Sequence, residues 1–192
     1  MGVMRVISGR FKGLSLPSVG SGTRPTTDRT KEALFSHLDA KGLLDAARVL
    51  DLYAGTGALG IEALSRGARE LIAVEASSRA VAGLNATLSA LRGQRGWAPG
   101  MATRALRTRA EAYAQRYRGD PFDVIFIDPP YALSSEDCEA LLRVLAAGDA
   151  TREGSVVVLE RSTRSRDVRI PEGWQVVDQR HYGETAVWFL EA

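Results

Sequence analysis

Long apolar runs, cysteine and histidine are all scarce in this chain. No apolar run approaches the length of a membrane span, about 18 residues, and the first ten residues lack the apolar stretch of a signal peptide. The single cysteine, Cys138, excludes an internal disulfide framework and suits a reducing compartment. With only two histidines beside it, the chain has too few ligands for a structural zinc site. We therefore expect a cytoplasmic protein without bound metal or membrane association.

Positive charge is concentrated in two segments, although the net charge is only +2. Residues 1–27 contain Arg5, Arg10, Lys12 and Arg24 and no acidic residue, while residues 92–118 contain seven arginines and one acid. Such an excess can neutralise phosphates. The alternative is a bias of composition, because the chain has 22 arginines against 3 lysines. Charge alone leaves nucleic-acid binding and this bias equally open.

Strand and helix patterns alternate from residue 48 onward, which favours an α/β fold with a doubly wound, mostly parallel sheet. The expected strands are residues 48–53, 70–75, 101–107, 122–128 and 155–160. The expected helices are residues 58–67, 78–92, 109–117 and 135–147, after a first helix over 28–39. Residues 174–180 and 184–190 predict a C-terminal antiparallel hairpin.

The 192 residues fit one domain with a small appendage. Short apolar pairs broken by glycines in the first 25 residues predict a small N-terminal β-hairpin. We therefore expect one domain over 26–192 and a small extension over 1–25, whose four cations without an acid suggest a contact with RNA.

A glycine-rich loop follows the first expected strand. DLYAGTGALG places Gly55, Gly57 and Gly60 between a strand and a helix, and Glu75 ends the next strand, where it can hold a ribose. In this context the motif predicts a cofactor that carries adenosine. Asp51 selects among such cofactors, because two like charges about 4 Å apart repel by roughly 4 kcal/mol at an effective dielectric of 20. A carboxylate there disfavours a pyrophosphate and favours the sulfonium and ammonium of S-adenosylmethionine.

A second motif, Asp128-Pro129-Pro130-Tyr131, ends the strand that we expect beside the one carrying Asp51. The prolines hold the backbone extended and fix their own angles. The Asp128 carboxylate and the Pro129 carbonyl are therefore two fixed acceptors, which can grip the two hydrogens of an exocyclic amine. If that amine belongs to a nucleic-acid base, Tyr131 can stack on the ring of the base. By contrast, Glu160 at the end of residues 155–160 is interpreted as a surface residue.

The stretches RVISGRFKGLSLP, TRPTTDRTKEALF, DLYAGTGALGIEALSRGA and DPPY, in this order, closely resemble the RsmD family. The resemblance implies a fold of the class I S-adenosylmethionine-dependent methyltransferase type. It also implies transfer of a methyl group to the 2-amino group of a guanine in 16S ribosomal RNA, free or within an assembling small subunit. We expect a monomer.

The resemblance also implies roles for individual residues. It implies that the base is held by Asp128, Pro129, Pro130 and Tyr131. It implies cofactor contacts from Asp51, Ala54, Gly55, Thr56, Gly57, Glu75, Ala76, Arg109, Ala110 and Thr27. It implies RNA contacts from Arg5, Arg10, Lys12, Arg24 and Arg29. Where the family tends to have Asn or Asp before Ala near the adenine, this chain has Arg109-Ala110.

Three other functions fit parts of the sequence. A DNA adenine or cytosine amino-methyltransferase would use the same chemistry, but the chain has no room for a separate target-recognition domain. A nicotinamide-dependent oxidoreductase would use the glycine loop, but Asp51 and the Asp-Pro-Pro-Tyr motif disfavour it. A non-catalytic RNA-binding module is disfavoured by the two intact motifs.

Overall fold

Seven strands form one mixed sheet in the computed structural model, which describes residues 4–17 and 28–192. Their order is β3-β2-β1-β4-β5-β7-β6, with parallel pairing up to β5 and antiparallel pairing in β5-β7-β6. The strands are β1 (Arg48–Leu52), β2 (Glu70–Glu75), β3 (Ala102–Arg107), β4 (Val124–Ile127), β5 (Val156–Ser162), β6 (Gln175–Tyr182) and β7 (Thr185–Glu191). The helices are α1 (Asp28–Ala40), α2 (Ala58–Arg66), α3 (Ser78–Arg92), α4 (Ala110–Arg116) and α5 (Ser135–Ala147).

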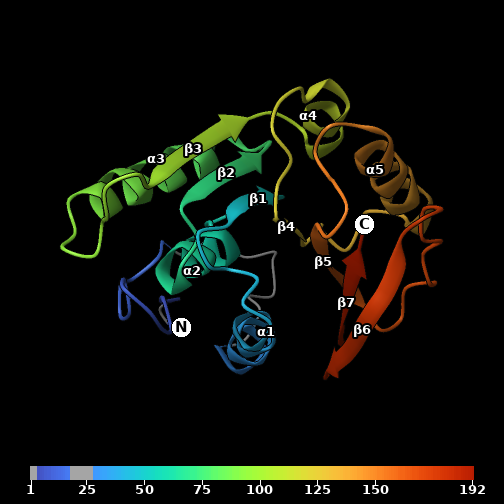
Figure 1. Ribbon diagram of the computed structural model, residues 1–192, viewed down its shortest axis with the longest axis horizontal. Helices are drawn as coiled ribbons and strands as arrows, with labels where there is room; N and C mark the ends of the chain where they lie inside the picture. The colour runs from blue at the N-terminus through green and yellow to red at the C-terminus, as the bar shows by residue number, and fades with distance from the viewer. Residues whose placement is uncertain (1–3, 18–27) are drawn as a thin grey trace.

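Helices cover both faces of this sheet, so the doubly wound architecture and the C-terminal hairpin are confirmed (Figure 1). One apolar cluster joins α1, α2 and α3 to one face of the sheet, and a second joins α4 and α5 to the other. The central parallel strands β1, β4 and β5 are buried on both sides over most of their length, and all four residues of β4 are inaccessible. That is why they read as continuous apolar runs in the sequence.

The strand order reverses beside β1, which pairs with β2 on one side and with β4 on the other. The predicted neighbourhood of the Asp51 strand and the Asp128 strand is therefore confirmed. In open parallel sheets, ligands bind outside the carboxyl ends of the strands at such a reversal. Figure 1 shows the loops that leave these strand ends.

The N-terminal segment 4–17 is an antiparallel loop closed by one β-bridge between Arg5 and Ser15. Its apolar side chains Val6, Phe11 and Leu16 are buried in the cluster that contains α1 and α2. The segment thus lies against the α/β body through its apolar residues, and it exposes its cations. The predicted boundary at residue 25 falls outside the described residues.

A buried carboxylate on α2 holds this segment in place. Glu62 is inaccessible, and its oxygens accept hydrogen bonds from the Ile7 and Ser8 N–H groups at 2.8 and 3.1 Å. Arg66 donates to the same carboxylate at 2.8 Å, and the Lys31 ammonium lies 3.6 Å away. A buried charge needs such partners. The contact joins residues that are 55 positions apart in the sequence.

Within the described ranges, none of the helices combines the length and apolar character needed to cross a membrane.

Candidate active site

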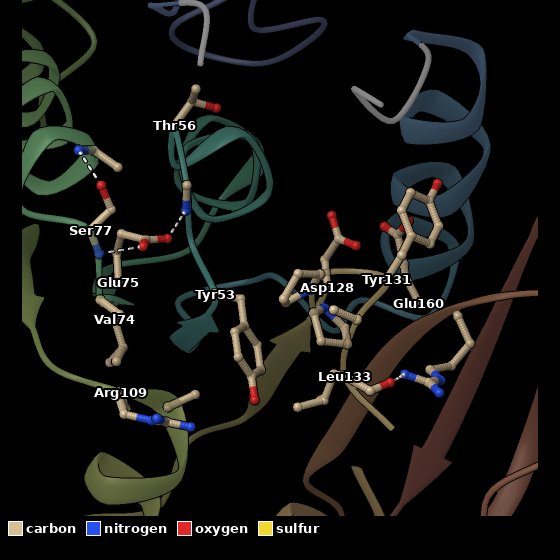
Figure 2. A pocket seen from close by; sticks show the side chains of 18 of the residues that line it. Tyr53, Thr56, Val74, Glu75, Ser77, Arg109, Asp128, Tyr131, Leu133 and Glu160 are labelled. Carbon is tan, nitrogen blue, oxygen red and sulfur yellow. Dashed lines mark hydrogen bonds between the residues drawn. The ribbon is translucent and has the colours of Figure 1, made fainter. Parts of the chain in front are cut away.

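A cavity of about 1620 Å³ lies at the carboxyl edge of the sheet (Figure 2). Its walls come from the loops after β1, β2, β3 and β4, from the end of β5 and from the β6–β7 turn. Pockets for a single small ligand span about 300–1,000 Å³. This cavity therefore has room for two ligands side by side.

Ten of the residues predicted for catalysis and cofactor binding line this cavity. They are Gly55, Thr56, Glu75, Ala76, Arg109, Ala110, Asp128, Pro129, Pro130 and Tyr131. Three others, Asp51, Ala54 and Gly57, are not among the lining residues. Thr27 and Arg24 lie outside the described residues. Arg5, Arg10, Lys12 and Arg29 are exposed and lie away from the cavity wall.

The glycine loop is shaped by packing as well as by its backbone angles. Gly57 has φ +78°, and a Cβ there would lie 2.5 Å from Leu84 Cδ1 of α3. A Cβ on Gly60 would lie 2.5 Å from Leu71 Cδ1 of β2. Real Cβ atoms do not approach this closely, so a larger residue at either position would have to displace a leucine methyl group, and at Gly57 it would also strain the left-handed backbone. The loop is pressed onto the sheet, which brings the backbone at Gly55 and Thr56 to the cavity wall.

Asp51 lies beneath this loop and is only 2% exposed. Its Oδ2 accepts a hydrogen bond from the Gly60 N–H at 3.0 Å, which joins the end of β1 to the first turn of α2. Burial, together with the charges of Asp128 and Glu75, raises the pKa of Asp51 to about 7, against the hydrogen bond from Gly60. Asp51 thus positions the loop and contributes charge from below, without reaching the cavity surface.

Glu75 connects two loops at the cavity wall. Its Oε2 accepts from the Gly55 N–H at 2.9 Å, and its Oε1 accepts from the Ser77 N–H at 2.7 Å. Ser77 in turn caps α3 through its hydroxyl, which accepts from the Ala80 N–H at 3.3 Å. Figure 2 shows these contacts on one side of the cavity. The carboxylate is held with its oxygens fixed and its surface open to a ligand.

Tyr53, which the sequence analysis missed, lies between the Glu75 side and the Asp128 side of the cavity (Figure 2). Its backbone has φ +62°, an uncommon angle for a non-glycine residue. Its hydroxyl donates to Glu111 Oε1 at 2.5 Å, and Glu111 also lines the cavity. Arg109 lies beside Glu111 at 3.4 Å and is 77% exposed. An aromatic ring therefore separates two halves of the cavity.

The Asp128–Tyr131 loop forms the other half. Beyond Pro130 the chain turns, with the Leu133 N–H bonded to the Pro130 carbonyl at 2.9 Å. Within the described part of the chain, the Asp128 carboxylate accepts no hydrogen bond. It is exposed to the cavity, while the surrounding protein displaces enough solvent to raise its pKa to about 6. Tyr131 is 64% exposed, so its ring is available for stacking.

The wall beyond Tyr131 also escaped the sequence analysis. It comprises Glu160, Arg161 and residues 182–185 of the β6–β7 turn. The interpretation of Glu160 as a surface residue is wrong, because it is 4% exposed and lines the cavity. The available signal was its position: a carboxylate at the carboxyl end of a parallel strand lies at the edge where ligands bind.

Known proteins resemble this chain over nearly its whole length. The family described as "Conserved hypothetical protein 95" matches residues 4–191. "Putative rRNA methyltransferase YlbH" of Bacillus subtilis (strain 168) is 37% identical over 190 residues, 96% of each chain. "Ribosomal RNA small subunit methyltransferase D" of Escherichia coli (strain K12) is 30% identical over 186 residues, 96% of this chain and 88% of that protein.

A solved structure extends this likeness to the fold. "Putative methyltransferase yhhF from Escherichia coli" has a TM-score of 0.82 and 28% identity, covering 99% of this chain and 98% of that one. The predicted fold of class I methyltransferases is confirmed.

The protonation of Asp51 should make stability fall as pH rises. Its pKa in the folded protein, about 7, lies above its ordinary value of 3.8. Between these values the folded state holds a proton that the unfolded state has released, so the free energy of unfolding falls by up to about 1.4 kcal/mol per pH unit. In Asp51→Asn the amide oxygen can still accept a hydrogen bond from the Gly60 N–H, but the side chain cannot titrate. The free energy of unfolding of this variant should therefore lack this part of its dependence on pH. Urea unfolding of both proteins between about pH 5 and pH 8 measures the difference, and parallel pH dependences would contradict it.

Proposed function

Because the chain belongs to the family described as "Conserved hypothetical protein 95", the RsmD family that its motifs resemble, we propose that it methylates the 2-amino group of a guanine in small-subunit ribosomal RNA, with S-adenosylmethionine as the methyl donor. One observation carries the proposal: the Asp128–Tyr131 loop and the Glu75 loop face a single cavity from opposite sides.

The half of the cavity around Glu75 fits S-adenosylmethionine. Glu75 presents fixed carboxylate oxygens to a ribose, and the Gly55-Thr56 backbone can approach the cofactor closely. Ala76 and the Arg109-Ala110 pair line the wall where an adenine would lie. Bound S-adenosylmethionine supplies an electrophilic methyl group on a sulfonium. The acidic strand ends favour this cation and disfavour a pyrophosphate, which leaves a dinucleotide cofactor without support.

The half around Asp128 fits an exocyclic amine. The Asp128 carboxylate and the Pro129 carbonyl are two acceptors for its two hydrogens, and the neighbouring proline rings hold them in place. An amine held in this way keeps its lone pair directed away from both acceptors, toward the half of the cavity around Glu75, where the methyl donor would bind. Tyr131 stacks on the ring, as aromatic side chains do with bases removed from a stack. The residues act by orientation and electrostatics.

RNA contact is assigned to one basic face, comprising Arg10, Lys12, Arg92 and Arg95, all of which are exposed. The two basic segments meet there. A Cβ on Gly96 would lie 2.6 Å from the Arg10 carbonyl oxygen, and the rings of Phe11 and Trp97 are 6.5 Å apart. Segment 4–17 also reaches the cavity, because Pro17 lines it. A ribosomal RNA substrate implies a cytoplasmic enzyme, and we expect a monomer.

The proposed reaction is tested with tritiated S-adenosylmethionine and small ribosomal subunits from cells that lack the gene. We expect label in the ribosomal RNA, and N2-methylguanosine after digestion to nucleosides. Naked RNA in a parallel reaction identifies the preferred substrate. Label in any other nucleoside would show that the assigned base is wrong, and label only in DNA would favour the DNA amino-methyltransferase.

Asp128→Ala should lower turnover at saturating cofactor by about 100-fold or more, because positioned electrostatic partners contribute on that scale. Its affinity for S-adenosylmethionine should change by no more than a few fold. With a pKa of about 6 in the ligand-free protein, only about a tenth of Asp128 is ionised at pH 5, so the wild-type kcat/KM should fall there to about a tenth of its value above pH 7. Asp128→Asn is the matched control, since it keeps an acceptor and cannot titrate. A wild-type kcat/KM that does not change down to pH 5 would contradict the proposal that Asp128 acts in its ionised form.

Glu75→Ala should weaken S-adenosylmethionine binding by about 10- to 100-fold, because the ribose hydroxyls lose a charged acceptor. Glu75→Gln keeps one oxygen for the Gly55 N–H, so it separates loop support from ribose binding. It should weaken binding less than alanine does. Isothermal titration calorimetry measures all three proteins. An affinity that alanine leaves unchanged would place the ribose elsewhere.

Replacing Arg10, Lys12 and Arg95 together by alanine should weaken substrate RNA binding. Each lost phosphate contact reduces the slope of log K against log salt by about 0.7, so the slope should flatten by up to about two units. Replacing Arg118, Arg143 and Arg169, which lie near α4 and α5 on the other side of the sheet, removes the same charge and serves as the control. Equal effects of the two triple variants would contradict the basic face.

A further inference from the structure

Asp128, which directly follows β4, and Glu160 of β5 come from neighbouring strands. Ile127 of β4 pairs with Leu159 of β5, so the next residues along the two strands are Asp128 and Glu160. Parallel strands are about 4.8 Å apart, and residues in register point to the same face. Both side chains line the cavity, and Figure 2 shows them with Tyr131 on the same side of it. Two carboxylates therefore reach the half of the cavity that is assigned to the base.

Glu160 differs from Asp128 in its burial. Asp128 is exposed to the cavity, whereas Glu160 is 4% exposed and forms part of the wall behind Tyr131. Burying a carboxylate is costly, and a strand end could as easily carry an apolar residue. A carboxylate kept at this position restricts what the cavity accepts, because groups with hydrogen-bond donors are favoured there and groups with lone pairs are repelled.

Support of the Asp128–Tyr131 loop comes from the next residue along β5. The Arg161 guanidinium donates to the Leu133 carbonyl at 3.0 Å and to the Ser135 hydroxyl at 3.2 Å. These contacts fix the loop where it returns to α5. Arg161 thus provides a variant in which loop support is lost while Glu160 is kept.

Guanine presents three N–H hydrogens along one edge, two on the 2-amino group and one on N1. Asp128 and Pro129 account for the two amino hydrogens, which leaves the N1 hydrogen. We propose that Glu160 determines specificity by accepting a hydrogen bond from guanine N1–H, so that the base is selected by the pair of carboxylates. Adenine, cytosine and 2-aminopurine all carry a lone pair at the corresponding ring nitrogen, which a carboxylate repels. This inference rests on the proposed function.

The test uses an RNA fragment that spans the modified nucleotide, once mass spectrometry of the RNA has located it. One version carries guanine at that nucleotide, and the other carries 2-aminopurine, which keeps the 2-amino group but has a lone pair at N1. The wild-type enzyme should prefer guanine by at least about 100-fold in kcat/KM, since sites built around one hydrogen bond reject analogues that lack it on this scale or beyond.

Glu160→Gln should narrow or reverse this preference. Its amide can donate to the N1 lone pair of 2-aminopurine, so methylation of that RNA should rise above the wild-type rate while methylation of guanine falls. Glu160→Asp keeps the charge but shortens the side chain, so it should lower the guanine rate without improving 2-aminopurine. Arg161→Ala should lower both rates by the same factor. Calorimetry with S-adenosylmethionine and the melting temperature show whether each variant is folded.

The outcomes separate this inference from the function beneath it. A wild-type enzyme that methylates no guanine, either in the fragment or in small ribosomal subunits, overturns the proposed function and this inference together. A wild-type enzyme that methylates guanine but accepts 2-aminopurine equally well overturns the inference alone. So does a Glu160→Gln variant that lowers both rates by one factor, as a structural role would. A gain on 2-aminopurine with Glu160→Gln, absent from Glu160→Asp, supports it.

Discussion

Repulsion among carboxylates at one sheet edge is the constraint on which the rest of the site depends. Four consecutive strands, β2, β1, β4 and β5, bring Glu75, Asp51, Asp128 and Glu160 to their carboxyl ends. At an effective dielectric of 20, two such charges about 4 Å apart repel by roughly 4 kcal/mol. The fold limits this cost in different ways. Glu75 accepts two backbone N–H groups, while Asp51 and Asp128 have raised pKa values. A ligand that carries positive charge or several N–H groups would reduce the repulsion that remains among these carboxylates.

The glycine loop shows how this edge is tied to the core. A Cβ on Gly57 would meet Leu84 of α3 and a Cβ on Gly60 would meet Leu71 of β2, so the loop packs closely against both elements. Asp51 adds a hydrogen bond from below. The half of the cavity around Glu75 is therefore held in place by packing, and the half around Asp128 is held by its two prolines. Neither half relies on a metal-ligand cluster among the described residues.

The sequence predicted what depends on local pattern. Strand and helix positions from residue 48 onward, and the pairing of β1 with β4, follow from periodicity and from the rules for parallel sheets. It did not reveal that Asp51 is covered by the turn it supports, or that Glu160 is buried, because the covering groups come from elsewhere in the chain. The sequence also did not predict that segment 4–17 packs against the core, because its three buried apolar residues do not recur at the spacing of a helix or a strand.

The tether between Glu62 and residues 7–8 also orders events during synthesis. The segment leaves the ribosome before its partner on α2, which follows 55 residues later. At about 5–20 residues per second, that interval lasts about 3–11 seconds. During it, Val6, Phe11 and Leu16 lack the part of their apolar cluster that α2 supplies, and they lie beside cations that attract nucleic acid. In the nascent chain, segment 4–17 therefore exposes both basic and apolar side chains before α2, against which it packs, has been synthesised.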